Sequence, residues 1–415
     1  LWWLLVVAAV VALNLRGEAP LPATTEEVPA TAAQVARGAY LARVGSCAGC
    51  HTARGGAAYA GGRGIETPFG KVFAGNLTPD VATGLGAWSS ADFWRALHHG
   101  RSRDGRLLYP AFPYPNYTQV TREDSDALYA YLRSLPAVAQ PRTPHALRFP
   151  FSTQAALAVW RALYFRPGQP PEDLSRSAEW NRGAYLVQGL GHCTACHTPR
   201  NALGAERKAQ ALGGGTVAGQ GWYAPALDMP AEAGVAQWSL QDVVALLQTG
   251  VAPQGSVTGP MAEVVFRSTQ HLTPTDARAI AVYLQALPQR SAPAVVAEPP
   301  AAAAALARGA KVYEQHCAQC HGDQGQGVPG AIAALAGNRA VLQADTTNLL
   351  RVVLQGGYLP ATAGNPRPHG MPPFQQFLSD EDVAAVTTFV RNSWGNQAPG
   401  VGTIEVYRAR ERRSP

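Results

Sequence analysis

The six cysteines of the chain fall in three copies of one short pattern. The copies read CAGCH, CTACH and CAQCH, and they begin at Cys47, Cys193 and Cys317. Two thiols three positions apart on one helical turn can each add to a vinyl group of a haem, and the adjacent histidine then lies under the iron. The pattern therefore predicts three covalently bound haem c groups.

Each motif gives its cysteines and its histidine separate roles. The cysteines form the thioether bonds, and the histidine is the proximal ligand of the iron. The predicted attachment residues are Cys47, Cys50, Cys193, Cys196, Cys317 and Cys320. The predicted proximal ligands are His51, His197 and His321. No cysteine is left for a structural disulfide, and no residue stands out as catalytic.

Two other kinds of site also use a C-x-x-C pattern. A structural zinc site usually takes four ligands from paired knuckles, and three separate copies do not supply such pairs. A thioredoxin-like redox site needs one C-x-x-C in a βαβ context, which this sequence lacks. Haem attachment is therefore favoured over both.

The chain has only three methionines that could supply a sixth iron ligand, and a methionine thioether raises the reduction potential of a haem. Met371, in HGMPPF, follows His321 by 50 residues, and Met261, in GPMAEVV, follows His197 by 64. Each stands before the closing helix of its unit, so we predict that both ligate iron rather than pack in the core. Met229 has no repeat partner and is expected to pack in the core.

The first copy of the repeat departs from this rule. When the copies are aligned on Gly100 and Gly250, Phe112 stands where a methionine is expected, and phenylalanine cannot ligate iron. His98 and His99 lie nearby, but a capping or exposed position at the end of a helix is favoured for them. The sixth ligand of the first haem therefore stays open.

Composition narrows the class of protein further. A length of 415 residues predicts two to four domains, and 47% apolar with 15% charged residues excludes a disordered chain. The net charge of +6 is not gathered in a Lys/Arg block before the last residues, so no nucleic-acid partner is expected. Three haems would carry about six propionates, which would offset this charge within the loaded protein.

The motifs belong to an internal repeat. Segments 36–52 and 181–198 match closely, and 307–322 is a more distant copy. Each unit continues with two amphipathic helices, the second of which follows a Thr or Ser suited to an N-cap. The predicted helices are 88–100, 238–250 and 346–357, with closing helices 124–135, 275–287 and 380–392.

Composition also sets the expected boundaries. Pro-rich segments predict linkers, and 154–165 predicts an apolar helix packed between domains, with a membrane or partner contact as the alternative. The expected divisions are an anchor over 1–16, a linker over 17–33, a first domain over 34–140, a connecting segment over 141–178, a second domain over 179–288, a linker over 289–303, a third domain over 304–396 and a tail over 397–415.

The first 15 residues, LWWLLVVAAVVALNL, are almost wholly apolar. As a helix they would span roughly 22 Å, which is short of the ~30 Å core of a bilayer. The chain does not begin with Met, so we expect further residues upstream. An uncleaved N-terminal anchor in a bacterial inner membrane, with the domains on the periplasmic face, is favoured over a cleaved signal peptide.

Several segments outside the motifs carry a resemblance to a known family. They are TPFG (67–70), NLTPD (76–80), LYPAFPY (108–114), RGAYLVQGLGHCTACHTPRNALGA (182–205), GPMAEVV (259–265) and SWGN (393–396). The chain resembles the trihaem cytochrome c subunits of bacterial membrane-bound periplasmic dehydrogenases over nearly its whole length. The resemblance implies an all-α fold of three tandem class I-like cytochrome c domains behind an N-terminal membrane helix.

The resemblance also implies partners. In that family the subunit takes electrons from a catalytic subunit and passes them to ubiquinone or another respiratory acceptor. Phe112 in the LYPAFPY segment is similar to the branch that serves molybdenum and iron–sulfur dehydrogenases of aldehydes or N-heterocycles. A pyrroloquinoline quinone alcohol dehydrogenase or a flavin sugar dehydrogenase is the alternative partner. A multihaem peroxidase-like enzyme that uses the open first haem is the alternative from another class.

Overall fold

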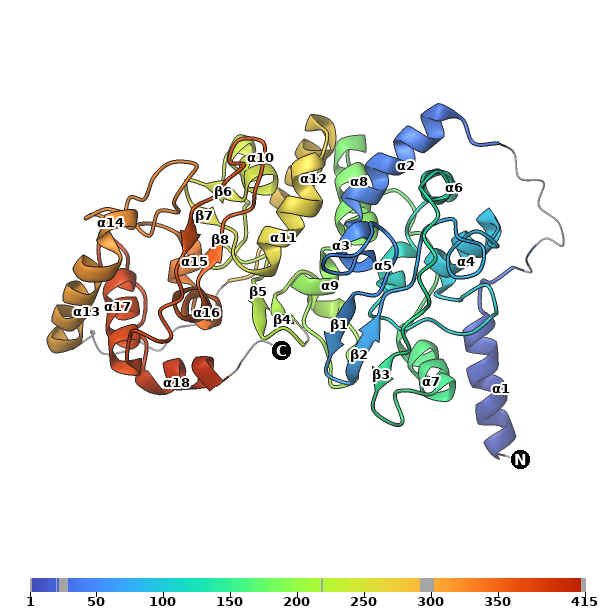
Figure 1. Ribbon diagram of the computed structural model, residues 1–415, viewed down its shortest axis with the longest axis horizontal. Helices are drawn as coiled ribbons and strands as arrows, with labels where there is room; N and C mark the ends of the chain where they lie inside the picture. The colour runs from blue at the N-terminus through green and yellow to red at the C-terminus, as the bar shows by residue number, and fades with distance from the viewer. Residues whose placement is uncertain (1, 20, 22–28, 218, 292–301, 412–415) are drawn as a thin grey trace. The chain divides into compact units, whose positions relative to one another are not determined.

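The structure is a computed structural model that describes residues 2–19, 21, 29–217, 219–291 and 302–411. Large parts of the expected linkers over 17–33 and 289–303, and the end of the expected tail over 397–415, lie outside these residues. The described part is mostly helical, with short strands (Figure 1). It divides into two compact units, Leu1–Ala195 with Arg200–Arg207 and Cys196–Pro199 with Lys208–Pro415.

The first unit contains two copies of the motif-bearing helical segment and one small sheet. Its helices are α1 (Trp2–Leu15), α2 (Ala32–Val44), α3 (Cys47–His51), α4 (Ser90–His99), α5 (Tyr114–Tyr117), α6 (Arg122–Arg133), α7 (Gln154–Tyr164), α8 (Ala178–Ala184) and the π-helical η1 (Tyr185–Leu190). Its strands are β1 (Gly64–Thr67), β2 (Gly70–Phe73) and β3 (Ala146–Leu147). Helix α9 (Thr194–His197) carries the second motif.

The closing helix α6 packs closely across α2. A Cβ at Gly38 would overlap the carbonyl oxygen of Ala127, so only glycine allows this approach of the two helices. Beside the crossing, Arg37 Nε donates to Asp124 Oδ1 over 2.8 Å, and the Asp124 carboxylate is buried. The RG pair in the repeated ARGAY segment therefore holds the first helix of the unit to its last.

The antiparallel sheet of the first unit has the strand order β1-β2-β3. Ile65 faces Val72 across β1 and β2, and Lys71 faces Ala146 across β2 and β3. The sheet thereby joins the loop that follows the first motif to the connecting segment that begins at residue 141. Two residues after the end of β2 comes Gly75, whose backbone carbonyl contacts His51 of the first motif.

Helix α1 corrects the expected N-terminal membrane anchor. It has 14 residues and a length of about 21 Å. Among the described residues, no helix combines the length and the apolar character needed to cross a bilayer. This finding overturns the prediction of an inner-membrane anchor. Near the end of the apolar run, Asn14 donates to the Ala158 carbonyl over 2.9 Å and accepts from Arg161 Nε over 3.0 Å.

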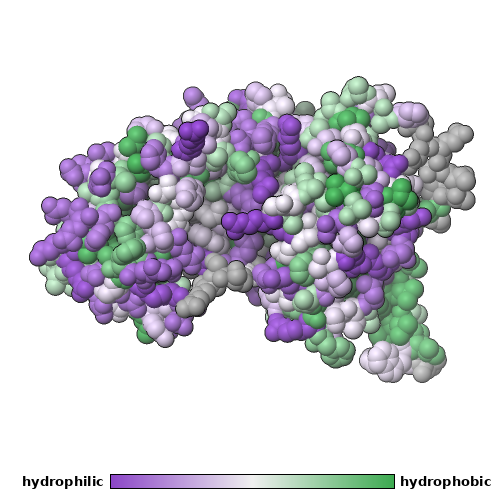
Figure 2. Space-filling view, viewed as in Figure 1, coloured by the Kyte–Doolittle hydropathy of each residue, from purple (hydrophilic) through white to green (hydrophobic). Residues whose placement is uncertain are grey.

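Helix α1 packs on α7, and most of its remaining surface is apolar and exposed (Figure 2). Arg161 lies under this contact, 4.8 Å from the ring centroid of Phe165. The apolar helix expected over 154–165 is confirmed as α7, and it packs on α1.

The second unit contains the rest of the second copy and the whole third copy. Its helices are η2 (Lys208–Gln210), α10 (Leu240–Thr249), α11 (Pro260–Arg267), η3 (Thr269–His271), α12 (Pro274–Gln285), α13 (Ala303–His316), α14 (Ala318–His321), α15 (Arg339–Leu342), α16 (Thr347–Gln355), α17 (Asp380–Arg391) and α18 (Thr403–Glu411). Its strand pairs are β4 (Gly215–Val217) with β5 (Trp222–Ala224), β6 (Val251–Ala252) with β7 (Gly255–Ser256), and β8 (Gly357–Tyr358) with β9 (Gly370–Met371).

The third copy repeats the helix crossing of the first. A Cβ at Gly309 in α13 would overlap the carbonyl oxygen of Ala385 in α17. Arg308 Nε donates to Asp382 Oδ1 over 2.8 Å, as Arg37 does to Asp124 in the first copy. Two segments far apart in sequence therefore build the same pair of crossed helices from the same residue types.

The expected N-caps of the closing helices are confirmed. The side chains of Thr121, Thr273 and Ser379 each accept a hydrogen bond from the backbone N–H three residues later, at the start of α6, α12 and α17. Each cap satisfies a backbone donor that the helix itself cannot satisfy. The repeat therefore fixes where each closing helix begins.

Candidate haem-attachment sites

Each motif forms a short helix that follows the first helix of its copy. The turn before the first two motifs needs a left-handed residue, with φ of 50° at Ser46 and 41° at His192. In each motif the first cysteine is half-buried and the second is exposed. Six sulfur atoms are thus placed in three pairs, each at the edge of a helical domain.

The three motif histidines share one contact, which the sequence did not predict. The Nδ1 atoms of His51 and His197 lie 2.7 Å from the carbonyl oxygens of Gly75 and Pro225. The Nδ1 atom of His321 lies 3.0 Å from the carbonyl oxygen of Ala333. A carbonyl only accepts, so Nδ1 carries the proton and Nε2 keeps its lone pair.

Burial keeps these imidazoles neutral. It lowers the pKa of His51, His197 and His321 below the usual value of 6.5, against the smaller opposing effect of the carbonyl contact. A neutral imidazole whose Nδ1–H is held by a carbonyl is the form that binds a metal through Nε2. The residues present therefore fit an iron ligand at each motif.

The thiols fit covalent attachment better than the two alternatives. Burial, and secondarily the neighbouring Cys50, raises the pKa of the Cys47 thiol to about 12. Burial likewise raises the pKa of Cys317 to about 11. Redox-active C-x-x-C sites instead lower a thiol pKa. Within the described ranges, no group of three His, Cys, Asp or Glu side chains gathers as a metal site, so a zinc knuckle has no ligand set.

The first motif is surrounded by aromatic side chains. Tyr117 donates to the carbonyl oxygen of Gly45 over 3.2 Å, and burial together with Cys47 and Cys50 raises its pKa well above 10. The ring of Phe112 lies 5.4 Å from the ring of Tyr117. Phe112, the residue at which the repeat alignment expects a sixth ligand, thus packs on a tyrosine that bonds the backbone just before the first motif.

The loop that carries Met371 reaches the third motif. Met371 is half-buried in β9, where it pairs with Gly357. Three residues later, the ring of Phe374 lies 6.1 Å from the ring of His316, which immediately precedes Cys317. The end of the HGMPPF segment therefore packs on the residue just before the third motif.

The loop that carries Met261 packs on Trp222, which precedes by three residues the carbonyl partner of His197. Gly259 packs so closely on Trp222 that a Cβ there would lie 2.7 Å from the indole. Trp222 belongs to β5, which leads into Pro225, the carbonyl partner of His197. Met261 itself is half-buried at the start of α11, whereas Met229 is buried in the core of this unit.

Neither His98 nor His99 contacts a motif in the interactions that the structure describes. The His98 ring stacks on Trp94 with 4.3 Å between centroids, and the His99 side chain is buried. Burial is the main reason why the pKa of each falls to about 4. His99 thus differs from the expectation of an exposed or capping residue: it is part of the core around α4.

Two arginines contact the motifs from outside, and neither contact was predicted from the sequence. Arg63 donates from Nη1 to the carbonyl oxygen of Gly49, and Arg200 donates from Nη2 to the carbonyl oxygen of Ala195 over 2.6 Å. Both carbonyls lie between the two cysteines of a motif. Arg63 follows His51 by 12 residues and Arg200 follows His197 by three, so no common spacing in the sequence would have suggested this.

The cytochrome c family profile matches two parts of the chain, residues 35–136 and 306–394, each of which contains one motif. The alcohol dehydrogenase (quinone) cytochrome c subunit of Gluconacetobacter polyoxogenes is 39% identical to the chain, over 93% of this chain and 86% of that protein. The gluconate 2-dehydrogenase cytochrome c subunit of Pantoea cypripedii is 38% identical, over 90% of this chain and 88% of that protein.

A third relative is longer. A nicotinate dehydrogenase subunit of Pseudomonas putida is 41% identical and aligns with all of this chain, which corresponds to 36% of that protein. The chain therefore spans about a third of this relative and most of the other two. The relatives agree on a subunit of a dehydrogenase but differ in the substrate that their names give.

Proposed function

Because this chain belongs to the family of cytochrome c subunits of dehydrogenases, we propose that it holds three covalent haem c groups and is the non-catalytic electron-transfer subunit of such a complex. The observation that carries the number three is the repeated proximal contact, Nδ1 of His51, His197 and His321 on a backbone carbonyl. The second motif has this contact although the family profile matches only the segments around the other two.

The chain's own residues determine how each group is held. The cysteine pairs of the three motifs form the thioether bonds, and each histidine offers a neutral Nε2 to iron. Haem c supplies a one-electron carrier when bound. Met261 and Met371 supply the sixth ligand in the second and third copies, whereas Phe112 gives the first copy an apolar neighbour that cannot coordinate.

The domain organisation that we propose has three tandem cytochrome c domains, over 34–140, 179–288 and 304–396. Its support is the crossed helix pair with its glycine and Arg–Asp contact, which the first and third copies share. The second copy supports it through its capped closing helix α12. These domains do not coincide with the two compact units, because the second motif lies where the units meet along the chain.

The catalytic partner that we favour is a molybdenum and iron–sulfur dehydrogenase of aldehydes or N-heterocycles. Phe112 beside the first motif carries this choice, and the relative from a nicotinate dehydrogenase aligns with the whole chain. A quinoprotein alcohol dehydrogenase or a flavin sugar dehydrogenase is the second candidate, favoured by the relatives named for alcohol and gluconate. Ubiquinone, or another respiratory acceptor, is the proposed destination of the electrons.

Two measurements on purified material test this proposal. A pyridine haemochrome assay on denatured protein should return three haems per chain, because thioether bonds survive unfolding. The double variant Cys193→Ala/Cys196→Ala should return two, and a wild-type count of two or fewer contradicts the proposal.

The second measurement concerns the partner. The chain should co-purify with a larger catalytic subunit, and the cofactor of that subunit decides the branch. Molybdenum with iron–sulfur clusters supports the favoured partner. Pyrroloquinoline quinone or flavin alone would select the second candidate, and purification of the chain without any dehydrogenase would contradict a role as subunit.

A further inference from the structure

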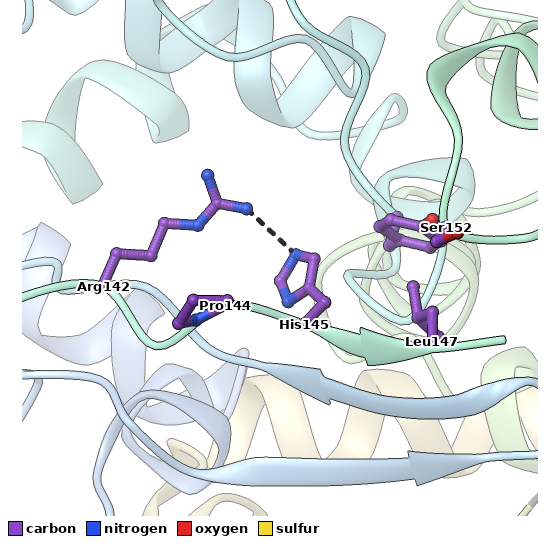
Figure 3. A pocket seen from close by; sticks show the side chains of 6 residues that line it. Arg142, Pro144, His145, Leu147 and Ser152 are labelled. Atoms are coloured by element: carbon purple, nitrogen blue, oxygen red, sulfur yellow. Dashed lines mark hydrogen bonds between the residues drawn. The ribbon is translucent and has the colours of Figure 1, made fainter. Parts of the chain in front are cut away.

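A cavity of about 330 Å³ lies beside the sheet of the first unit, at one end of the connecting segment (Figure 3). It is lined by Tyr109, Arg142, Pro144, His145, Leu147 and Ser152. Figure 3 shows the side chains of Arg142 and His145 pointing toward each other across it. Nothing in the proposed electron-transfer role uses this cavity.

The imidazole of His145 faces two hydrogen-bond donors. The backbone N–H of Phe73 donates to Nδ1 over 3.1 Å, and Arg142 Nη2 lies 3.3 Å from Nε2. In a neutral imidazole one ring nitrogen accepts a hydrogen bond and the other carries a hydrogen. Nδ1 accepts from Phe73 here, so Nε2 carries the hydrogen. The Arg142 guanidinium and the Nε2–H of His145 are therefore two donors that face the cavity, with no acceptor between them.

The charges around the cavity are positive. Arg142 and Arg106 both lower the pKa of His145 to about 4, after the larger effect of burial, so this imidazole is neutral at pH 7. The Asp104 carboxylate, which acts electrostatically on Arg142, accepts from Arg106 Nε over 2.8 Å. The Tyr109 hydroxyl donates to the carbonyl oxygen of Phe151. One guanidinium charge is left to face the cavity, which favours an anion over a neutral carbonyl compound.

Two backbone segments connect the cavity to the surroundings of the first motif. The N–H of Phe112 donates to the carbonyl oxygen of Tyr109 over 2.9 Å, so one wall belongs to the turn that holds Phe112. Phe73, which holds His145, precedes by two residues Gly75, the carbonyl partner of His51. Phe73, which bonds His145, is thus two residues from the carbonyl that contacts His51. Tyr109, which lines the cavity, is three residues from Phe112.

We infer that this cavity binds a carboxylate, which accepts hydrogen bonds from the Arg142 guanidinium and from Nε2–H of His145. Charge-assisted bonds from arginine to carboxylate are among the strongest in proteins. The carboxylate has two sources: a propionate of the haem at Cys47 and Cys50, or a free organic acid from solution. The first source rests on the proposed haem attachment at that motif.

The experiment compares three forms of the haem-loaded protein: wild type, Arg142→Gln and the control Arg103→Gln. Arg103 is exposed, belongs to the same unit and does not line the cavity, so its variant removes the same charge elsewhere. Redox titrations from pH 5 to 9 measure the pH dependence of each haem potential, and isothermal titration calorimetry measures binding of acetate.

If the carboxylate is a propionate, Arg142→Gln moves the ionisation that governs one haem potential to higher pH by at least one pH unit, because the carboxylate loses its cation. Acetate then binds none of the three forms. If the carboxylate is free, acetate binds wild type and Arg103→Gln, and Arg142→Gln weakens it at least tenfold.

The inference is overturned if Arg142→Gln matches Arg103→Gln in both measurements. The haem count separates this failure from a failure of the proposed function. Three haems with no effect of Arg142 would refute the carboxylate cavity alone, whereas a missing first haem would refute the proposed attachment.

Discussion

The sites that we propose at the first and third motifs share their histidine contact and differ in the side chain that the later loop brings. In both, Nδ1 of the histidine lies on a loop carbonyl, at 2.7 Å for His51 and 3.0 Å for His321. The side chain brought by the later loop differs, Phe112 in the first copy and Met371 in the third. One fold can therefore keep its histidine geometry while a single loop residue changes the coordination that it offers.

The helix pairs behind the two motifs differ in a second way. The Asp124 side chain is 2% exposed, and it accepts from Tyr185 over 2.6 Å as well as from Arg37. The Asp382 side chain is 26% exposed, and the side chain of its partner Arg308 is about half exposed. The carboxylate of this Arg–Asp contact is thus buried in the first copy and partly exposed in the third, whereas the two arginines are about equally exposed.

Exchange of the distal residues gives the largest expected effect. Met371→Phe should remove one Met–iron bond and lower that haem's potential, because a thioether ligand raises it. Phe112→Met should add one such bond and raise the potential of the first haem, since the two side chains have similar bulk. Redox titration of each variant measures both changes. Met229→Leu is the matched control and should leave all potentials unchanged; an unchanged potential in Met371→Phe would remove Met371 from the ligands.

Loss of the arginine should affect the first helix pair more than the third. Arg37→Ala leaves the buried Asp124 carboxylate with Tyr185 as donor but without its cation, and should cost about 2 kcal/mol of local stability. Arg308→Ala should cost much less, because an exposed pair contributes little. Hydrogen exchange in α6 and α17 measures the two losses. Asp124→Asn in the Arg37→Ala background should recover part of the stability, and equal losses in the two copies would contradict the difference in burial.

Acid should loosen the first copy before the third. Burial lowers the folded pKa of His98 and His99 to about 4, below the usual 6.5, so the unfolded chain binds protons that the folded chain does not as pH falls from about 6.5 to about 4. Arg308 lowers the pKa of Asp382, so its contribution is present above pH 3.8 and is lost only below it. Amide exchange should therefore accelerate in α4, but not in α17, between pH 6.5 and 4. A His99→Gln variant should weaken that dependence; identical profiles in both helices would refute it.

The local parts of this architecture could be predicted from the sequence. The spacing of apolar residues and the capping residue are local signals that decide where a helix forms and begins. The helices predicted close to their observed bounds are α4, α6, α10, α12, α16 and α17. The carbonyl partners of the histidines could not be predicted, because they follow the motifs by 24, 28 and 12 residues and depend on how each loop folds back.

The apolar N-terminal segment shows the limit of composition. Its sequence favoured a membrane anchor, but the contact that ends α1 lies far away in the chain, at Ala158 and Arg161. The Arg142–His145 cavity escaped prediction for the same reason, since it needs β2 and β3 to pair before Phe73 meets His145. Contacts of this kind join segments about 70 to 145 residues apart, which no local pattern encodes.

The most direct test is the number of Met–iron bonds per haem in the oxidised wild-type protein. The Met–iron charge-transfer absorption band of oxidised His/Met haem, divided by the haem content of the same sample, gives this ratio. We predict three haems with two Met–iron bonds, contributed by Met261 and Met371, and none at the first site. Three Met–iron bonds would make Met229 a ligand and contradict the assignment of Phe112 to the distal position of the first haem.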